Sequence, residues 1–339
     1  MNTKITLSAD INRNKTYLLF LELCRNDEVT VDKIAHFGKK MMKKAKIHPH
    51  FFGDRSLLDN ARYLTFFSLK LPYDYKNQAY LKRKISENDA VVILKLFERR
   101  ITERKPVEYL TQETFYLGRK FFVNENVLIP RSVMNTQFVD FLRQMQWENY
   151  RVLDLCAGSG CIGISLALME PNIKVDLADI SGSALEVAQI NINNYALHER
   201  VKCIQTDLFE NIQDKYDLII TNPPYVSDYE YKHQPTEIKN EPALALKGGV
   251  DGLHIVNEII LQSKEYLNPN GLLICEVGHA CASLLKRKYR KHKFEWCKSK
   301  LFEGTEPLVD QFIRWLGLLD SFFICDAHKL PTTKRKDEI

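Results

Sequence analysis

The tetrapeptide Asn222-Pro223-Pro224-Tyr225 is the part of the sequence whose residue types most directly suggest chemistry. Two consecutive prolines hold the backbone φ at about −65° and remove two N–H donors, so the turn offers mostly acceptors. The side-chain oxygen of Asn222 and the carbonyl of Pro223 can accept both hydrogens of a planar NH2 group, while the Tyr225 ring covers its π face. The turn is therefore predicted to orient an amide or an aromatic amine as a nucleophile. An ordinary proline-rich surface turn is the alternative.

The segment that precedes this turn, residues 217–221, is short and apolar. Its length and the turn residues that flank it are typical of a buried parallel strand. In open α/β sheets, ligands bind just beyond the carboxyl ends of the strands. The turn is thus expected at the edge of the sheet where substrates bind.

A glycine-rich loop, GSGCIG at residues 158–163, lies between an expected strand and an expected helix, and Asp179 ends the next strand. This spacing alone fits a dinucleotide, with Asp179 on a ribose diol, and leaves an NAD-dependent dehydrogenase open. Asp154 stands just before the loop, and Asp207 follows the third strand. Three carboxylates suit cationic S-adenosylmethionine better than a pyrophosphate, with Asp154 facing its amino group and Asp207 its adenine. Helix capping or turn formation is the alternative for Asp179 and Asp207.

Strands and helices alternate around these motifs. Strands are expected at residues 151–156, 173–178, 201–205, 217–221, 271–277 and 321–326, and helices at 133–147, 161–169, 183–195, 251–266 and 279–289. A long polar loop is expected from the NPPY turn to about residue 249, and a partly helical connection at residues 304–320. Alternation at this spacing predicts a parallel, doubly wound α/β sheet.

The first part of the chain has helical periodicity instead. Helices are expected at residues 15–25, 31–46, 55–71 and 86–104. After Pro106, aromatic and β-branched residues on either side of Gly118 predict a β-hairpin. The expected domains are a helical substrate-recognition domain at residues 1–105, a hairpin linker at 106–130, the α/β domain at 131–328 and a polar tail at 329–339.

Charge is unevenly distributed along the 339 residues, whose net charge is +5. Basic residues number 24 against 14 acidic ones in residues 1–120, 11 against 21 in residues 121–285, and 13 against 8 in residues 286–339. The basic N-terminal part is expected to contact an acidic partner such as ribosomal RNA. A solvated helix surface is an equally good interpretation.

The eight cysteines form no C-x-x-C pair and have no metal-type spacing with histidine. They indicate free thiols in a reducing compartment, and no bound metal is expected. The sequence has no signal-peptide pattern and no apolar run of about 18 residues. We therefore expect a cytoplasmic protein that does not bind a membrane.

The motifs DLCAGSGCIG, ADIS, TDLF and NPPYV, in this order, resemble those of the HemK/Prm family. Members of this family are class I S-adenosylmethionine-dependent methyltransferases that modify a glutamine side-chain amide in protein substrates. The segments EPALAL and GGVDGL, at residues 241–253, and LICEVG, at residues 273–278, extend the resemblance. It implies a Rossmann-like, mostly parallel seven-stranded sheet with a small N-terminal helical domain.

The resemblance also implies roles for individual residues. Cofactor binding falls to Asp154, Ala157, Gly158, Gly160, Asp179, Asp207 and Asn222. Catalysis falls to Asn222, Pro223 and Tyr225, and substrate binding to the same three residues with Pro224, Glu241 and Pro242.

The stretch from ERKPVEYL to IPRS, residues 103–132, resembles the PrmB branch of the family, whose substrate is large-subunit ribosomal protein L-three. The release-factor branch carries PRPDTE where this chain has Pro130-Arg131-Ser132, and a release-factor glutamine methyltransferase is one alternative. An adenine amino-group methyltransferase acting on nucleic acid is another, because the turn reads NH2 geometry. The family's glutamate is absent after Arg131. This absence keeps open a catalytically silent ribosome-assembly scaffold.

Overall fold

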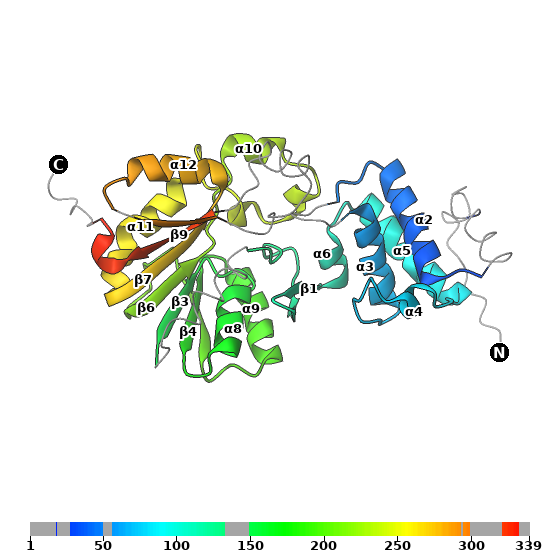
Figure 1. Cartoon of the computed structure of the whole chain (residues 1–339), viewed down its shortest axis with the longest axis horizontal. Helices are drawn as coiled ribbons and strands as arrows, with labels where there is room; N and C mark the ends of the chain where they lie inside the picture. The colour runs from blue at the N-terminus through cyan, green and yellow to red at the C-terminus, as the bar shows by residue number, and fades with distance from the viewer. Residues whose placement is uncertain are drawn as a thin grey trace. The chain divides into compact units, whose positions relative to one another are not determined.

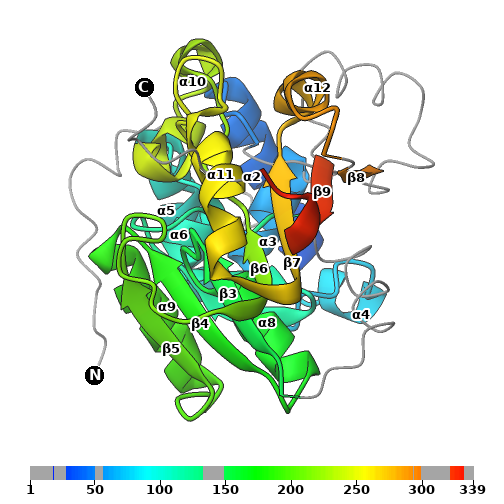
Figure 2. The same cartoon turned by 90° about the vertical axis from the view of Figure 1, so that its left-hand side faces the viewer.

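The computed structural model describes Leu18 and residues 28–49, 56–132, 149–292, 294–298 and 321–331. The chain forms two compact units, residues 1–111 and residues 112–339. Figures 1 and 2 colour the described residues by position, from blue at α2 to red at β9. The expected helix at 133–147 and the connection at 304–320 lie outside the described residues, as does the helix at 15–25 apart from Leu18.

The N-terminal unit is helical. Its described helices are α2 (Val31–Lys44), α3 (Leu57–Ser68), α4 (Gln78–Leu81), α5 (Glu87–Thr102) and α6 (Val107–Thr111). Three of them, α2, α3 and α5, pack around a core that includes the fully buried side chains of Ile34, Leu64 and Phe97. Gly38 lets α2 approach α5 closely, since a Cβ there would lie 2.5 Å from the Phe97 ring. The helices predicted at 31–46, 55–71 and 86–104 are confirmed, with shorter ends.

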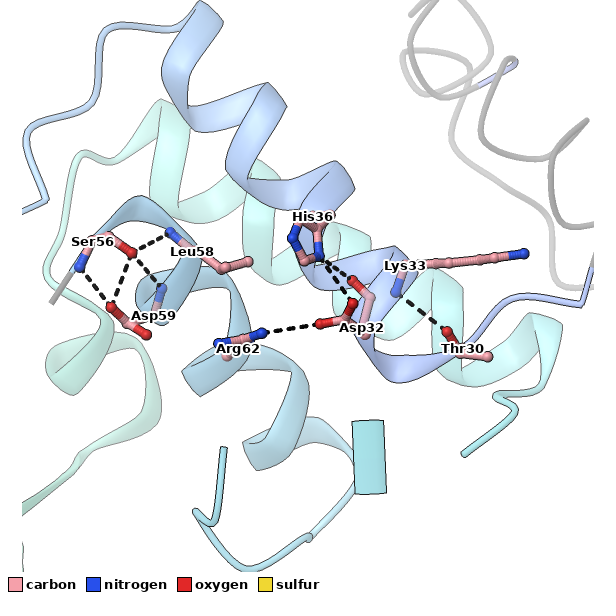
Figure 3. A network of polar contacts seen from close by, with 8 residues as sticks. All are labelled: Thr30, Asp32, Lys33, His36, Ser56, Leu58, Asp59 and Arg62. Atoms are coloured by element: carbon pink, nitrogen blue, oxygen red, sulfur yellow. Dashed lines mark hydrogen bonds and ion pairs between the residues drawn. The ribbon is translucent and has the colours of Figure 1, made fainter. Parts of the chain in front are cut away.

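Side chains fix the starts of α2 and α3 (Figure 3). Thr30 Oγ1 accepts a backbone N–H bond of 3.3 Å and caps α2. Ser56 and Asp59 form the capping box of α3, in which the Ser56 N–H donates to the Asp59 carboxylate at 2.7 Å. The carboxylate of Asp32 accepts from Arg62 at 3.1 Å and ties α2 to α3. The two caps, at Thr30 and Ser56, satisfy backbone donors that a helix start otherwise leaves unpaired.

The predicted hairpin begins the second unit. Strands β1 (Glu113–Tyr116) and β2 (Arg119–Phe122) pair antiparallel around the Leu117-Gly118 turn, where both residues have positive φ. Asn191 accepts from the Phe122 N–H at 2.7 Å and donates to the Phe122 and Ser159 carbonyls, both at 3.0 Å. One buried amide thereby ties the hairpin to the glycine-rich loop.

The prediction of β structure from residue 106 onward is wrong at its start, where residues 107–111 form helix α6. All five residues of α6 are buried. Packing on every side of the segment therefore overrides the strand propensity of its valine, tyrosine and threonine.

The second unit contains, among its described residues, a seven-stranded sheet of order β5-β4-β3-β6-β7-β9-β8. The strands are β3 (Arg151–Leu155), β4 (Lys174–Asp179), β5 (Val201–Gln205), β6 (Tyr216–Thr221), β7 (Leu267–Val277), β8 (Glu295–Lys298) and β9 (Ser321–Asp326). Pairing is parallel from β5 to β7, whereas β9 is antiparallel to both β7 and β8. The predicted α/β class and mostly parallel sheet are confirmed; β8 was not predicted.

Helices cover both faces of this sheet (Figure 1). The covering helices are α8 (Cys161–Met169), α9 (Gly182–Asn194), α11 (His254–Tyr266) and α12 (His279–Lys288). The other described helical elements of this unit are α10 (Asp228–His233), which buries no residue, and the single 3-10 turns η3 (Ile238–Asn240), η4 (Ala243–Ala245) and η5 (Ala327–Lys329). A hydrophobic core lies on each face of the sheet, and successive residues of β3 point into opposite cores. Val152 packs in the core with α8 and α9, and Leu153 packs in the core with α11 and α12. The predicted long polar loop contains α10, η3 and η4, which were not predicted.

The strand order reverses between β3 and β6. From β3 the chain continues to β4 and β5 on one side, and then crosses to β6 on the other. Loops that leave neighbouring strands at such a point diverge and open a crevice beyond the carboxyl ends. The last residues of the two strands, Leu155 and Thr221, are paired. The glycine-rich loop and the NPPY turn therefore begin side by side.

Candidate active site

A cavity opens at this crevice. The loops that follow β3, β4, β5 and β6 line it, together with residues from the segments 126–132 and 242–247 and from α11. Of the residues predicted for the site, Ala157, Gly158, Asp179, Asp207, Asn222, Pro224 and Pro242 are among the lining residues. Asp154, Gly160, Pro223, Tyr225 and Glu241 lie next to lining residues in the sequence but are not among them.

Two of the three glycines of the GSGCIG segment, Gly158 and Gly160, have positive φ, 54° and 74°, but different tasks. A Cβ at Gly160 would lie 2.7 Å from the Leu177 side chain, so this glycine allows the start of α8 to pack on β4. Nothing lies within 4 Å of a Cβ at Gly158. The backbone at Gly158 is therefore open to a molecule in the cavity.

Asp179 holds the loop from the end of β4. Its Oδ2 accepts from the Gly158 N–H at 2.8 Å, and its Oδ1 accepts from the Ser181 N–H at 2.9 Å. Burial raises the pKa of Asp179, and the backbone N–H bonds from Ser181, Gly158 and Ile180 only partly oppose it. Each carboxylate oxygen has capacity for a second donor, so the group can accept from a pair of vicinal hydroxyls.

The structure places Asp154 behind the glycine-rich loop. The residue is 1% exposed, and its Oδ2 accepts from the Gly163 N–H of α8 at 2.8 Å. Its Oδ1 has no hydrogen-bond partner within the described part of the chain. Burial raises the pKa of Asp154 to about 8; the Gly163 bond opposes this shift and the nearby Asp179 charge adds to it. In the protein without ligand, the Asp154 carboxyl group is thus largely protonated at neutral pH.

Two glycines of the GGVDGL segment enclose the backbone of the NPPY turn. Val226 N donates to the Leu246 carbonyl, and Gly248 N donates to the Val226 carbonyl, both at 2.8 Å. A Cβ at Gly248 would lie 2.8 Å from the Pro224 oxygen, and one at Gly252 would lie 2.3 Å from the Tyr225 oxygen. Only glycines permit this approach, so the segment fixes the turn that carries Asn222.

A buried ion pair joins two segments that line the cavity. Arg131 Nη1 lies 2.7 Å from one oxygen of Glu241 and 2.9 Å from the other, and the Ile129 N–H donates to the same carboxylate at 2.9 Å. The Glu241 side chain has no exposed surface. Glu241 therefore acts on the cavity through Arg131 and Ile129. No sequence pattern indicated this pair, because 110 residues separate its members.

The described residues contain no group of three or more histidine, cysteine, aspartate and glutamate side chains that could hold a metal ion. The described cysteines Cys156, Cys161, Cys203, Cys275, Cys281 and Cys325 are free thiols. Within the described ranges no helix is long and apolar enough to cross a membrane.

The sheet order, the helices on both faces and the cavity at the switch point define a class I, Rossmann-like methyltransferase fold. Residues 136–249 match the family model described as Methyltransferase small domain. The chain is 38% identical to a protein of Neisseria meningitidis serogroup B named Ribosomal protein uL3 glutamine methyltransferase. The alignment spans 282 residues, which are 81% of this chain and 91% of the Neisseria protein. A Burkholderia pseudomallei protein of the same name is 37% identical, over 76% of this chain and 87% of its own length. The chain belongs to this family of ribosomal protein uL3 glutamine methyltransferases.

A solved structure with the same fold is the hMettl16 catalytic domain in complex with a MAT2A 3'UTR hairpin. It superposes with a TM-score of 0.50 and 15% sequence identity, over 80% of this chain and 95% of that chain. At this identity the likeness shows the fold alone. The predicted family is confirmed by the curated relatives.

Proposed function

We propose that this protein transfers a methyl group from S-adenosylmethionine to a glutamine side-chain amide of ribosomal protein L-three. One observation carries the proposal: the glycine-rich loop and Asn222, which follow the adjacent strands β3 and β6, line one cavity. Family membership favours this function over the release-factor enzyme, the adenine methyltransferase and the silent scaffold.

The residues around the cavity fit S-adenosylmethionine. The open backbone at Gly158 admits a ligand, and the Asp179 oxygens can accept from the two ribose hydroxyls. Asp207 also lines the cavity, and we assign it to the adenine. Ala157 completes the set that we assign to cofactor contact, with Gly160 and Asp154 shaping the loop from behind. Asn222 borders the cofactor but contributes little to its affinity, because we assign its side chain to the target amide. When bound, the cofactor supplies an electrophilic methyl group and leaves as S-adenosylhomocysteine.

The NPPY turn, residues 222–225, is called the acceptor turn below because it is assigned to the amide that accepts the methyl group. It orients a poor nucleophile. The Asn222 side-chain oxygen and the Pro223 carbonyl accept the two amide hydrogens, and the Tyr225 ring covers the face of the amide. Catalysis then depends on orientation and on these two acceptors, and the methylated nitrogen loses one proton to water. The product is amide-N-methylglutamine. Pro224 and Pro242 line the acceptor side of the cavity, and Glu241 orients the segment that carries Pro242.

The charge distribution supports a ribosomal substrate. Residues 121–285 carry ten more acids than bases, which suits a basic protein that itself binds RNA. We assign substrate recognition to residues 1–105, the helical part of the chain, in which exposed lysines of α2 such as Lys39, Lys40 and Lys43 offer a contact for ribosomal RNA. The family and the free thiols support a cytoplasmic reaction.

Transfer of labelled methyl from S-adenosylmethionine tests the proposal, with L-three, release factor and ribosomal RNA offered separately. Label on one glutamine of L-three is expected, and Asn222→Ala should abolish it while leaving cofactor binding nearly intact. Label on release factor would change the substrate, and label on RNA would replace the proposed reaction. A large loss of cofactor affinity in Asn222→Ala would refute the assignment of this residue to the acceptor.

A further inference from the structure

A buried carboxylate lies beneath the acceptor turn. Glu276, on β7, is 1% exposed. Its Oε2 accepts from Ser132 Oγ at 2.5 Å, and its Oε1 accepts from the Tyr225 hydroxyl at 3.4 Å. β7 runs parallel to β6, and its Cys275 is paired with Thr221, the last residue of β6. The sheet therefore delivers Glu276 to the same edge as the turn.

The ring of Tyr225 lies against backbone. A Cβ at Gly278 would be 3.1 Å from Cδ2 and 3.3 Å from Cε2 of Tyr225, so the glycine makes room for the ring. At the other end of the residue, Cys281 Sγ lies 3.4 Å from the Tyr225 carbonyl oxygen. Main chain, ring and hydroxyl of Tyr225 are thus each in contact with the region around the end of β7.

These contacts join three segments that are far apart in the sequence. Ser132 follows the hairpin, Tyr225 belongs to the acceptor turn, and Glu276 is the second-last residue of β7. Ser132 and Glu276 are 144 residues apart in the sequence. A buried carboxylate is stable only when donors satisfy it, and hydroxyl donors to such a group make strong hydrogen bonds. The short bond therefore fixes the Ser132 hydroxyl, and the longer contact with Glu276 gives the Tyr225 hydroxyl a preferred direction.

We propose that Glu276 is a positioning residue for methyl transfer: it fixes the Tyr225 hydroxyl, and Ser132 orients its carboxylate. This inference rests on the proposed function, in which the Tyr225 ring covers the target amide. With the hydroxyl held, the ring keeps one orientation before the substrate arrives, so less freedom is lost on binding. Glu276 itself is buried beneath the turn and is given no contact with substrate.

The chain offers a matched control at the opposite edge of the sheet. Asp176 is 4% exposed and accepts from the Tyr216 hydroxyl at 2.8 Å. It also accepts from Arg151 at 3.1 Å. In this second pair of a buried carboxylate and a tyrosine, Asp176 lies on β4 and Tyr216 is the first residue of β6. A purely structural role predicts similar consequences for Glu276→Gln and Asp176→Asn, whereas positioning predicts that only the first affects turnover.

The kinetic test uses Glu276→Gln, Tyr225→Phe, the double variant and Asp176→Asn. We expect Glu276→Gln and Tyr225→Phe each to lower kcat about 10-fold, with unchanged affinity for S-adenosylhomocysteine. The double variant should be no slower than either single variant, because both changes remove the same contact. Wild-type kcat in Glu276→Gln, multiplicative losses in the double variant, or an equal loss in Asp176→Asn would overturn the proposal.

A second readout does not depend on turnover. In protein labelled with 3-fluorotyrosine, the resonance of Tyr225 is assigned by its loss in Tyr225→Phe. Glu276→Gln should shift or broaden this resonance and leave that of Tyr216 unchanged, while Asp176→Asn should do the reverse. An unaltered Tyr225 resonance in Glu276→Gln refutes positioning. Failure of the wild-type enzyme to methylate any of the offered substrates instead refutes the proposed function.

Discussion

Arg131 and Glu241 form a nearly buried ion pair in which one guanidinium nitrogen contacts both carboxylate oxygens, at 2.7 Å and 2.9 Å. The side chains are 12% and 0% exposed. Ile129 adds a backbone donor to the same carboxylate. The pair joins the segment that follows the hairpin to the segment that carries Pro242. Both segments line the cavity, so their relative position decides its shape.

Glu241→Gln should destabilise the protein and weaken cofactor binding. The substitution keeps the size of the side chain but leaves the Arg131 charge without its counterion, which typically costs about 3–5 kcal/mol of unfolding free energy for a buried pair. Urea denaturation and calorimetric titration of S-adenosylhomocysteine measure the two effects. The control is Glu28→Gln, which removes the exposed ion pair with Lys84 and should change little. Equal stability of the two variants would contradict the prediction.

The motifs that directly follow strands, such as Asp179 and the NPPY turn, could be predicted from the sequence because each is a short local pattern. The run of residues 217–221 and the alternation around it predicted β6 and its neighbours, and the sheet order then brought Asp179 and Asn222 to one cavity. Helix α10 could also have been predicted, since Ser227 and Glu230 form a capping box with the S-x-x-E spacing.

The pairs Arg131–Glu241 and Ser132–Glu276 were not readable in this way. Each joins side chains more than a hundred residues apart, and neither periodicity nor turn chemistry encodes such a contact. Strand β8 was missed for a related reason: its four residues, EWCK, gain their strand conformation by pairing with β9. Contacts between residues far apart in the sequence therefore determine both the side-chain pairs that hold the site and the outermost strand β8. No local sequence pattern encodes such contacts.

Cofactor affinity should fall as the pH is lowered through the raised pKa of Asp179. Its ionised oxygens accept hydroxyl donors better than the protonated carboxyl does, and burial places this protonation at a higher pH than for an exposed aspartate. Calorimetric titration of S-adenosylhomocysteine across the acidic range measures the effect. In Asp179→Asn the affinity should be at least about 10-fold weaker and lack this pH dependence, because an amide NH2 would face Gly158 N–H or Ser181 N–H. Wild-type affinity that does not change with pH would rule out this role of the carboxylate.

The pKa of Asp154, raised by burial to about 8, predicts a pH-dependent stability in the absence of ligand. An unfolded aspartate has a pKa of about 3.9, so the folded state holds one more proton between the two values. The free energy of unfolding should therefore be highest below the lower pKa and fall as pH rises through the upper one, with a slope of up to about 1.4 kcal/mol per pH unit. Asp154→Asn keeps an acceptor for Gly163 N–H but removes the titration, so its advantage over the wild type should grow from pH 5 to pH 8 in urea denaturation. Parallel pH profiles of the two proteins would show that Asp154 does not titrate in this way.

Gly252→Ala should abolish methyl transfer through contact with the acceptor turn rather than through backbone strain alone. Gly252 has φ of 77°, and an added Cβ would lie 2.3 Å from the Tyr225 carbonyl oxygen, a backbone atom that cannot move without displacing the turn. Gly118, in the hairpin, has a similar φ of 72° and nothing within 4 Å of its Cβ position. Gly118→Ala therefore carries only the cost of positive φ, on the order of 1 kcal/mol, and should methylate at the wild-type rate. Gly252→Ala should keep S-adenosylhomocysteine binding, because the glycine-rich loop and Asp179 are untouched, and should lose turnover by at least about 100-fold as Asn222 and Pro223 are displaced. Similar turnover in the two alanine variants would mean that the close approach at Tyr225 does not set the geometry of the acceptor.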